Sequence, residues 1–219
     1  MWHFSRRCRF VSKKSVKTAT SSSPPRLVLA SGSRHRRALL ERLGLAFDVV
    51  PADIDERAAP HERPADTAVR LAEAKARTVA RLQRDALVIG SDQVAELAGQ
   101  AIGKPRDRAD ALEQLRSMRG HTVVFHTAVA LVNAATDVCR TALVDVASTF
   151  RNLDDATLED YLEHEQPFDC AGSVKSEGLG IVLFTRIASD DPTALIGLPL
   201  IRLTDLLEAE GVRVLRRVE

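Results

Sequence analysis

The sequence predicts an α/β fold with an α+β-like mixed sheet, and three observations support this fold class. Apolar residues alternate along the chain between short strand-like runs and longer stretches with the 3.6-residue period of an amphipathic helix. The chain has 219 residues, 45% of them hydrophobic, which is enough for one large core or two small ones. No segment repeats at a fixed period, so a solenoid or a propeller is not expected.

The first half of the domain is expected to alternate strands with helices. Apolar runs predict strands at 26–30, 47–51 and 86–92. A stripe of apolar residues predicts a helix over 36–45, with Gly44 near its end; the stripe consists of Ala38, Leu39, Leu43 and Ala46. A long amphipathic helix follows over 66–82, with Asp66 as its expected cap. Gly99 marks the turn of a hairpin that follows the 86–92 strand.

The second half begins with a helix over 107–118 and is then dominated by a long hairpin. The segments 121–132 and 139–150 are rich in β-branched residues and are joined by "NAATDV", so they should pair as antiparallel strands. Asp154 is expected to cap a helix over 154–164. The glycine-rich loop "DCAGSVKSEGLG" then leads to a strand at 181–187 and a last helix near 199–210.

Residues 1–25 differ in composition from the rest of the chain. They contain six Lys or Arg, no Asp or Glu, and end in Pro-Pro. Such a composition is found in disordered extensions and in organelle transit peptides, and a basic tail could also contact nucleic acid. We expect a disordered extension over 1–25 and a single folded domain over 26–219.

Composition and charge argue against several classes of protein. A formal net charge of +1 creates no strong field, so nucleic acid is not an expected partner. No apolar run approaches the roughly 18 residues that a membrane span needs, and no stretch has the apolar core of a signal peptide. The three cysteines, Cys8, Cys139 and Cys170, form no CxxC pair, so neither a disulfide framework nor a thiolate zinc site is expected. We expect a cytoplasmic protein without a membrane partner; a homodimer is compatible with the sequence.

The junction between the first strand and the first helix has the chemistry of a phosphate site. The strand runs into Ser31 and Ser33 around a glycine, and Arg34, Arg36 and Arg37 follow at the start of the helix. Backbone N–H groups at a helix start attract anions, and guanidinium groups bind phosphate oxygens in pairs. The alternative is that these arginines simply face solvent. The loop is not a Walker A motif, because the Lys-Ser/Thr pair is missing.

Two acids are candidates for a metal site. Asp92 ends an apolar strand at the edge where α/β sheets bind ligands, and Glu56 lies in an acidic loop. Carboxylates from different segments can share a hard divalent cation, Mg²⁺ or Mn²⁺, which a polyphosphate substrate requires. The alternatives are a turn residue for Asp92 and a solvated acid for Glu56.

Three lysines stand apart from the general preference of this chain for arginine. Outside residues 1–25, the only lysines are Lys75, Lys104 and Lys175. A compact ammonium group is a good phosphate ligand, so all three are candidate substrate-binding residues, although each by itself is compatible with an ordinary surface position.

Eight strings in the chain resemble, in order and spacing, the Maf family of nucleotide pyrophosphatases. They are "LASGSRHRRALL", "DIDE", "LAEAKA", "IGSDQV", "IGKP", "MRGH", "FDCAGSVKSEGLGI" and "DPTALIGLPLIRL". No single string is specific, but the ordered set is, and it extends over residues 26–210. "GSDQV" together with "AGSVKSEG" is similar to the subgroup that hydrolyses 7-methyl-GTP rather than to the dTTP/UTP subgroup.

The resemblance implies a two-lobed fold around a central nucleotide cleft, a divalent metal cofactor, and hydrolysis of a nucleoside triphosphate substrate to monophosphate and diphosphate. It implies that Asp92 is the proton acceptor, that Ser31, Ser33 and Arg36 belong to the phosphate-binding loop, and that Glu56, Lys75 and Lys104 are other polar residues of the cleft. It also implies that His35, Gln93 and Glu177 lie at the positions that set base preference. The family often has a proline and an aromatic residue where this chain has Arg34 and His35, so stacking on the base would rely on imidazole.

Several functional alternatives remain open from the sequence. Asp92 could deprotonate the attacking water directly or act by holding a metal ion. Within the same family the substrate could be dTTP or UTP. A non-catalytic nucleotide-binding regulator of septum formation is a further alternative, and nucleic-acid binding through residues 1–25 is another.

Overall fold

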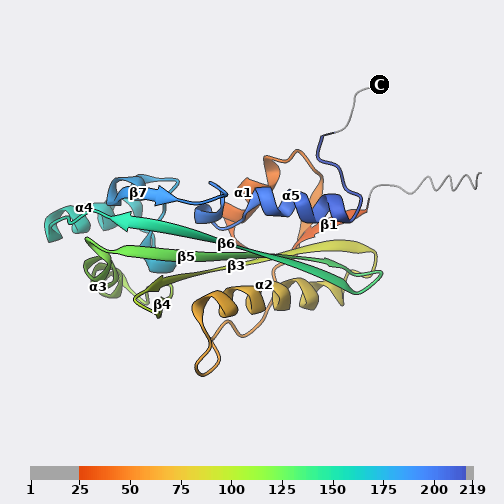
Figure 1. The fold of residues 1–219 in the computed structure, drawn as a ribbon, viewed down its shortest axis with the longest axis horizontal. Helices are drawn as coiled ribbons and strands as arrows, with labels where there is room; N and C mark the ends of the chain where they lie inside the picture. The colour runs from red at the N-terminus through yellow and green to blue at the C-terminus, as the bar shows by residue number, and fades with distance from the viewer. Residues whose placement is uncertain (1–24, 216–219) are drawn as a thin grey trace, which may run out of the picture.

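Three long strands form the frame of the molecule (Figure 1). The computed structural model describes residues 25–215, so the extension predicted over 1–25 lies, except for its last residue, outside the described residues. β3 (Ala86–Leu97), β5 (Thr122–Asn133) and β6 (Val138–Phe150) are neighbours in one sheet and pair antiparallel over almost their full length. The sheet order is β2-β1-β3-β5-β6-β7, with β4 (Gln100–Ile102) paired to the far end of β3.

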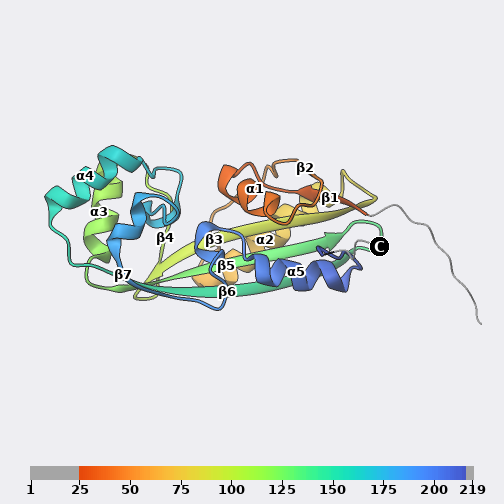
Figure 2. The same ribbon diagram turned by 90° about the horizontal axis from the view of Figure 1, so that it is seen from above.

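Elements gather at the two ends of these strands and form two lobes (Figure 2). One lobe carries α3 (Arg108–Met118), α4 (Asp155–Glu165) and β7 (Phe184–Ala188). The other carries β1 (Arg26–Leu29), β2 (Phe47–Val49), α1 (Arg34–Glu41), α2 (Pro64–Ala80) and α5 (Leu200–Ala209). β1 pairs parallel with both β2 and β3, whereas the remaining pairs are antiparallel, so the predicted mixed sheet is confirmed.

Each lobe has its own buried apolar core, and the long strands contribute residues to the cores of both lobes. α2 packs on one face of the sheet through small side chains, including Ala68, Ala72 and Ala76. α1 and α5 cover the opposite face through leucines, including Leu39, Leu40, Leu203 and Leu207. The other lobe packs α3 and α4 around Phe125 and Phe150. Burial of these faces in a three-layer arrangement is the main contribution that favours this fold.

Two helices begin or end at different residues from those predicted. α1 ends at Glu41. Of the predicted apolar stripe, Leu39 is buried and Leu43 packs against the same core, whereas Ala38 and Ala46 are exposed, so the stripe was wrong at the two alanines. The chain leaves the helix early because Gly44 adopts a left-handed conformation with φ of 65°. α2 begins at Pro64 with Arg63 as the N-cap, so Asp66 lies in the first turn and is not the cap.

The strands on either side of the cleft also differ from the prediction. β3 does not end at Asp92 but continues to Leu97, because β5 supplies hydrogen-bond partners along its whole length. Only the neighbour β1 stops early, with Leu29 opposite Ile89, so Asp92 lies just beyond the end of β1. The predicted strand at 181–187 is in part a 3₁₀ segment, Leu179–Leu183, followed by β7.

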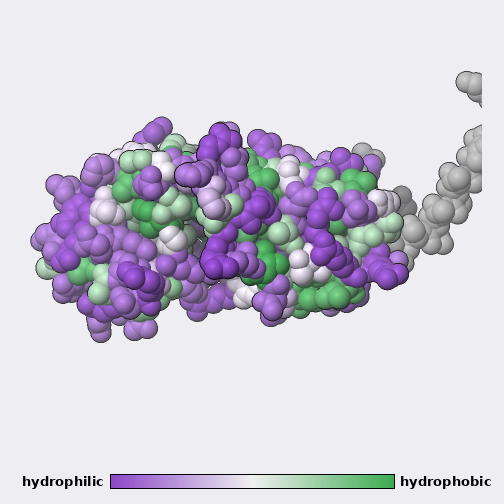
Figure 3. Space-filling view, turned by 90° about the horizontal axis from the view of Figure 1, so that it is seen from below, coloured by the Kyte–Doolittle hydropathy of each residue, from purple (hydrophilic) through white to green (hydrophobic). Residues whose placement is uncertain are grey.

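The surface shows no broad hydrophobic area on the side that Figure 3 presents. Hydrophilic residues cover most of that side, and hydrophobic residues occur in small separate groups. Within residues 25–215, no helix has both the length and the apolar character that a membrane span requires.

Candidate active site

A cleft of about 920 Å³ lies between the lobes and collects residues from seven separate segments. Its volume falls in the range of small-molecule binding sites, about 300–1,000 Å³. The polar residues that line it include Ser31, Ser33, His35, Arg36, Glu56, Lys75, Asp92, Gln93, Lys104, Asp169 and Cys170. The structure therefore brings together most of the predicted candidates, which in the sequence lie between Ser31 and Lys104.

The loop between β1 and α1 forms one wall of this cleft. Ser33 is the N-cap of α1, and its hydroxyl accepts a hydrogen bond from the backbone N–H of Arg36 at 3.4 Å. The hydroxyl of Ser31 accepts from the backbone N–H of Ser33 at 3.2 Å and from Nη1 of Arg36 at 3.4 Å. The helix start and the serine hydroxyls thus face the cleft in the arrangement that binds phosphate oxygens.

Arg36 is held across the cleft by the opposite segment. Its Nε donates to the backbone carbonyl of Gly197 at 2.9 Å and its Nη1 to the hydroxyl of Ser31, and the residue lines the cleft between these two contacts. Burial lowers the pKa of Arg36, and the carboxylates of Asp92 and Glu56 act in the opposite direction. An arginine remains protonated under such conditions, so the side chain supplies a fixed positive charge.

The position of α2 on the sheet places an ammonium group next to Asp92. Gly90 of β3 faces α2, and a Cβ at this position would lie only 2.8 Å from the backbone nitrogen of Ala76 and closer still to the carbonyl oxygen of Ala72. Glycine thus allows the backbones of α2 and β3 to approach closely. As a result, Nζ of Lys75 donates to Oδ1 of Asp92 at 2.6 Å.

Lys75 and Asp92 are both buried and satisfy each other's charge. Their residues are only 5% and 6% exposed, respectively. The same ammonium lies 2.7 Å from Oε1 of Glu56, which reaches in from the loop before α2. A buried charge persists in a protein only when it is paired, so this triad of one cation and two anions is a built feature of the site.

The pKa of Glu56 reflects the positive charge that surrounds it. Partial burial by itself would raise that pKa, but the hydrogen bond from Lys75 and the charges of Lys75, Lys104 and Arg36 outweigh this effect and lower it. Glu56 is therefore ionised at neutral pH. Lys104, which lies in the exposed loop after β4, acts on Glu56 through its charge and lines the same cleft.

Residues on opposite faces of β3 have different partners, because successive side chains of a strand alternate. Asp92 faces α2, whereas the amide of Gln93 faces the 3₁₀ segment Ala194–Ile196 and donates to the backbone oxygens of Ala194 and Leu195 at 3.0 Å each. Gln93 lines the cleft, but its amide nitrogen holds this segment in place.

His35 and Glu177, both predicted to set base preference, are in direct contact. Nδ1 of His35 lies 2.5 Å from Oε1 of Glu177. His35 lines the cleft and Glu177 does not, so the carboxylate acts at the cleft by orienting the imidazole. The two residues that the sequence separates by a large part of the chain thus act on the same corner of the site.

Lys175 and Glu177 are the two candidates that do not line the cleft, and the ion-pair partner of Lys175 does not line it either. The ammonium of Lys175 forms an ion pair with Glu165 at the end of α4, and the other carboxylate oxygen of Glu165 accepts from the backbone N–H of Leu179 at 2.6 Å. Lys175 is absent from the cleft lining. Its ion pair holds the glycine-rich loop against α4.

Sequence reasoning missed three residues that position the site. Gly90 sets the approach of α2, Gly197 accepts from Arg36, and Asp191 organises the segment that carries Gly197. Asp191 is 1% exposed and accepts from the backbone N–H groups of Thr193 and Ile201 at 2.9 and 2.7 Å. A glycine inside a strand is the one available signal, because it indicates the close approach of another backbone.

The donor set at Asp92 and Glu56 fits a hard divalent cation. Both are oxygen ligands, one oxygen of each lies within 2.7 Å of Nζ of Lys75, and both residues line the cleft together with the wall that is suited to phosphate. Mg²⁺ is commonly held by one or two carboxylates together with substrate phosphates and water, so two protein carboxylates suffice. The positive charge of Lys75 partly neutralises the negative charge of the two carboxylates.

A family model described as "Maf-like protein" matches residues 26–210. The chain belongs to the Maf family. Curated relatives agree with this membership. A protein of Cupriavidus metallidurans named 7-methyl-GTP pyrophosphatase is 54% identical over 192 residues, which cover 88% of this chain and 96% of the relative. A protein of the same name from Nitrosococcus oceani is 51% identical over 195 residues, covering 89% and 98%, and one from Aromatoleum aromaticum is 55% identical over 187 residues, covering 85% and 96%.

The Maf family match ends at residue 210 and begins where β1 begins, at Arg26. It therefore includes both lobes and every residue of the cleft. The predicted family and the predicted two-lobed α/β fold are both confirmed.

Proposed function

We propose that this Maf protein hydrolyses 7-methyl-GTP to 7-methyl-GMP and diphosphate. One observation carries the proposal: the cationic start of α1 and the buried Lys75–Asp92 pair line the same cleft, which has room for a nucleotide. The names of the three relatives described above support the choice of substrate, because they share more than half of their residues with this chain.

The phosphates are bound by the β1–α1 loop and the three cleft cations. Ser31 and Ser33 offer hydroxyl and backbone N–H donors, and Arg36, Lys75 and Lys104 offset the charge that develops on the departing diphosphate. Arg36 is fixed by Gly197 before substrate arrives, so little reorganisation is needed when it engages a phosphate.

The attacking water is positioned by Asp92. This carboxylate is buried, hydrogen-bonded to Lys75, and located just beyond the end of β1, beside the phosphate wall. It is within the cleft and can accept a proton from the water or orient it. Asp92 and Glu56 would hold a divalent ion, Mg²⁺ or Mn²⁺, which supplies charge neutralisation for the phosphates when bound.

The base is recognised at the corner formed by His35 and Glu177. The 7-methylguanine ring is cationic, so a carboxylate in this corner adds attraction to hydrogen bonding. Uracil and thymine lack both the positive charge and the N1–H and 2-amino donor pair of guanine. The contact between His35 and Glu177 favours 7-methyl-GTP over the alternative dTTP or UTP substrates.

The proposal is tested by measuring diphosphate release from 7-methyl-GTP, GTP, UTP and dTTP, with Mg²⁺ and with Mn²⁺. We expect the highest kcat/KM for 7-methyl-GTP. Equal or higher values for UTP or dTTP would transfer the assignment to the other subgroup, and no release from any of the four would support a non-catalytic binder.

Asp92→Asn is the matching variant. It should lower kcat by about 10²–10⁴, the range expected for loss of a general base. The control is Asp137→Asn in the exposed β5–β6 turn, where φ of 57° is a conformation that asparagine accepts. This control should retain wild-type turnover. If Asp92→Asn retained it too, the assigned role of Asp92 would be wrong.

A further inference from the structure

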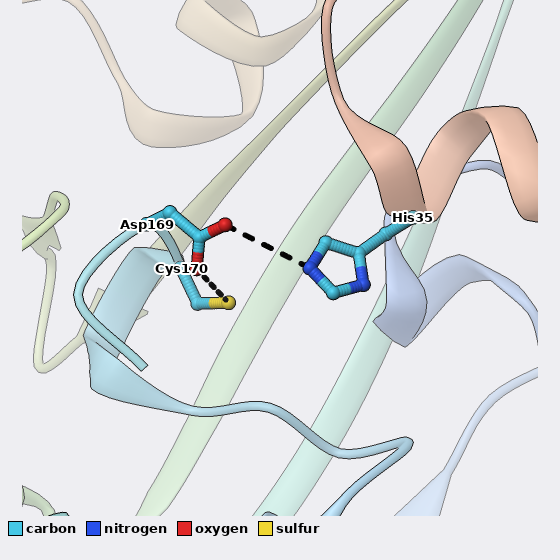
Figure 4. A group of neighbouring side chains, drawn as sticks. All are labelled: His35, Asp169 and Cys170. Atoms are coloured by element: carbon cyan, nitrogen blue, oxygen red, sulfur yellow. Dashed lines mark hydrogen bonds and ion pairs between the residues drawn. The ribbon is translucent and has the colours of Figure 1, made fainter. Parts of the chain in front are cut away.

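Three side chains with metal-binding atoms meet at the rim of the cleft, apart from the Asp92–Glu56 pair. They are His35, Asp169 and Cys170, and one ligand atom from each lies within 4.8 Å of the others. His35 belongs to α1 in one lobe, while Asp169 and Cys170 belong to the loop after α4 in the other lobe (Figure 4). Among residues 25–215, this is the one group of three or more such side chains that the geometry brings together.

The spacing of these atoms is close to what a tetrahedral ion needs. Nε2 of His35 lies 3.8 Å from Oδ2 of Asp169, and Sγ of Cys170 lies 3.5 Å from Oδ1 of Asp169. Around tetrahedral zinc, with bonds of about 2.0–2.3 Å, neighbouring ligand atoms are about 3.5 Å apart. Small side-chain rotations would therefore suffice to bring all three to one ion.

The hydrogen bonds of His35 point independently to a ligand role. Nδ1 lies 2.5 Å from the Glu177 carboxylate, and Nε2 accepts a hydrogen bond from Nε of Arg34 at 3.3 Å. This network assigns the proton to Nδ1, so that Nε2, the atom that faces Asp169, is the acceptor nitrogen, and a metal ion at Nε2 would replace the long hydrogen bond from Arg34. A carboxylate that holds the far nitrogen of a histidine is the usual support of a metal-binding imidazole.

We propose that His35, Asp169 and Cys170 form a binding site for a soft or borderline divalent cation of the Zn²⁺ class, which ties the two lobes together across the mouth of the cleft. The set of one imidazole, one carboxylate and one thiol suits Zn²⁺ rather than Mg²⁺. It leaves a fourth position for water or for a ligand in the cleft. The site is separate from the oxygen donors at Asp92 and Glu56, and it does not depend on the proposed hydrolytic function.

Three features compete with the ion: the proton of Cys170, the ion pair of Arg34 with Asp169, and the 3.3 Å hydrogen bond from Arg34 to His35. Burial, together with the charge of Asp169, raises the pKa of Cys170 to about 12, so the thiol is protonated until a metal replaces the proton, which passes to solvent. Arg34 lies 3.8 Å from Asp169 in a largely exposed pair, and such pairs contribute little.

The test is a titration of the full chain with Co²⁺, a spectroscopic substitute for Zn²⁺ whose thiolate bond gives a charge-transfer band. We expect the band to appear with one equivalent of Co²⁺ and to vanish when Zn²⁺ is added. Cys170→Ser should abolish the band. The matched control, Cys8→Ser combined with Cys139→Ser, removes the other two cysteines of the sequence and should keep it.

Further variants keep the test decisive if Cys170→Ser fails to fold. Asp169→Asn should leave the charge-transfer band but weaken Co²⁺ binding, and Glu177→Gln should weaken it about tenfold or more by removing the negative charge that supports the imidazole of His35. No band in the wild-type protein, or a band that Cys170→Ser retains, would overturn the proposal. Zn²⁺ should also slow diphosphate release more in the wild-type protein than in Cys170→Ser. The Co²⁺ spectrum does not depend on turnover, so a failure of the hydrolytic proposal is distinguishable from a failure of the metal-site proposal.

Discussion

Replacing Gly90 by alanine is expected to damage both the fold and the site, because this glycine sets the distance between α2 and β3. The added Cβ would meet backbone atoms of Ala72 and Ala76, including the nitrogen of Ala76 at 2.8 Å. Backbone atoms cannot rotate away as a side chain does, so α2 would have to retreat by about 1 Å to restore ordinary van der Waals contact.

The magnitude follows from this movement. Overpacking of a core costs about 1–3 kcal/mol, and the upper end applies here because the clash is with the backbone of a helix whose small side chains fill one core layer. For a domain of this size, a loss of about 3 kcal/mol lowers Tm by roughly 6–12 °C. The same retreat carries Lys75 away from Asp92, whose hydrogen bond of 2.6 Å leaves little tolerance. A misplacement of about 1 Å in a catalytic site can reduce turnover about 10²-fold.

The assay combines thermal unfolding with measurement of diphosphate release. The release is measured well below the Tm of the variant, so that a lower rate cannot be due to unfolding. Gly103→Ala serves as the control for stability, because a Cβ at Gly103 meets nothing within 4 Å and its φ is not in the left-handed region. Its Tm should equal that of the wild-type protein. If Gly90→Ala matched the wild-type protein in both Tm and turnover, the argument that this glycine positions Lys75 would be refuted.

Three further predictions concern the charges of the cleft. Lys75→Met should leave the buried Asp92 without its partner and destabilise the protein by about 3 kcal/mol in denaturant unfolding; an unchanged midpoint would contradict the pairing. Glu56 has a lowered pKa in the folded protein, so its ionised form stabilises the fold. This contribution is complete above the pKa of an unfolded glutamate, about 4.3, and is lost as the pH falls from there through the lowered pKa of the folded protein. The stability of Glu56→Gln should therefore fall less steeply with acid, and parallel acid-unfolding curves would argue against this. Glu177→Gln keeps a hydrogen-bond acceptor for His35 but loses the charge, and should lower the ratio of 7-methyl-GTP to UTP turnover about tenfold or more; an unchanged ratio would remove Glu177 from base selection.

The elements that sequence patterns predicted well are those whose signals are local. Asp107 and Asp154 cap α3 and α4 through hydrogen bonds to residues three positions later, at 2.8 and 2.9 Å. The β5–β6 hairpin likewise follows from two long strand-like segments around one short turn. Such features depend on neighbours within a few residues, so they can be recognised without the rest of the chain.

The elements that were predicted wrongly depend on distant partners. β3 extends beyond Asp92 because β5 pairs with it, and the acid at position 92 gives no hint of that partner. The strand predicted at 181–187 starts late because Gly178 and Gly180 pack closely on Glu165 and on the backbone of Lys175, which favours a 3₁₀ segment there.

The sequence by itself determined which chemical groups are available and the family to which they belong: serines and arginines at a helix start, isolated lysines, an acid after an apolar run, and eight ordered motifs. Only the tertiary structure decided which of these groups meet. Lys75 reaches Asp92 and Glu56, whereas Lys175 pairs with Glu165 outside the cleft. The physical reason is that distances between residues far apart in the chain are set by the packing of helices and strands, and here by how closely α2 can approach Gly90.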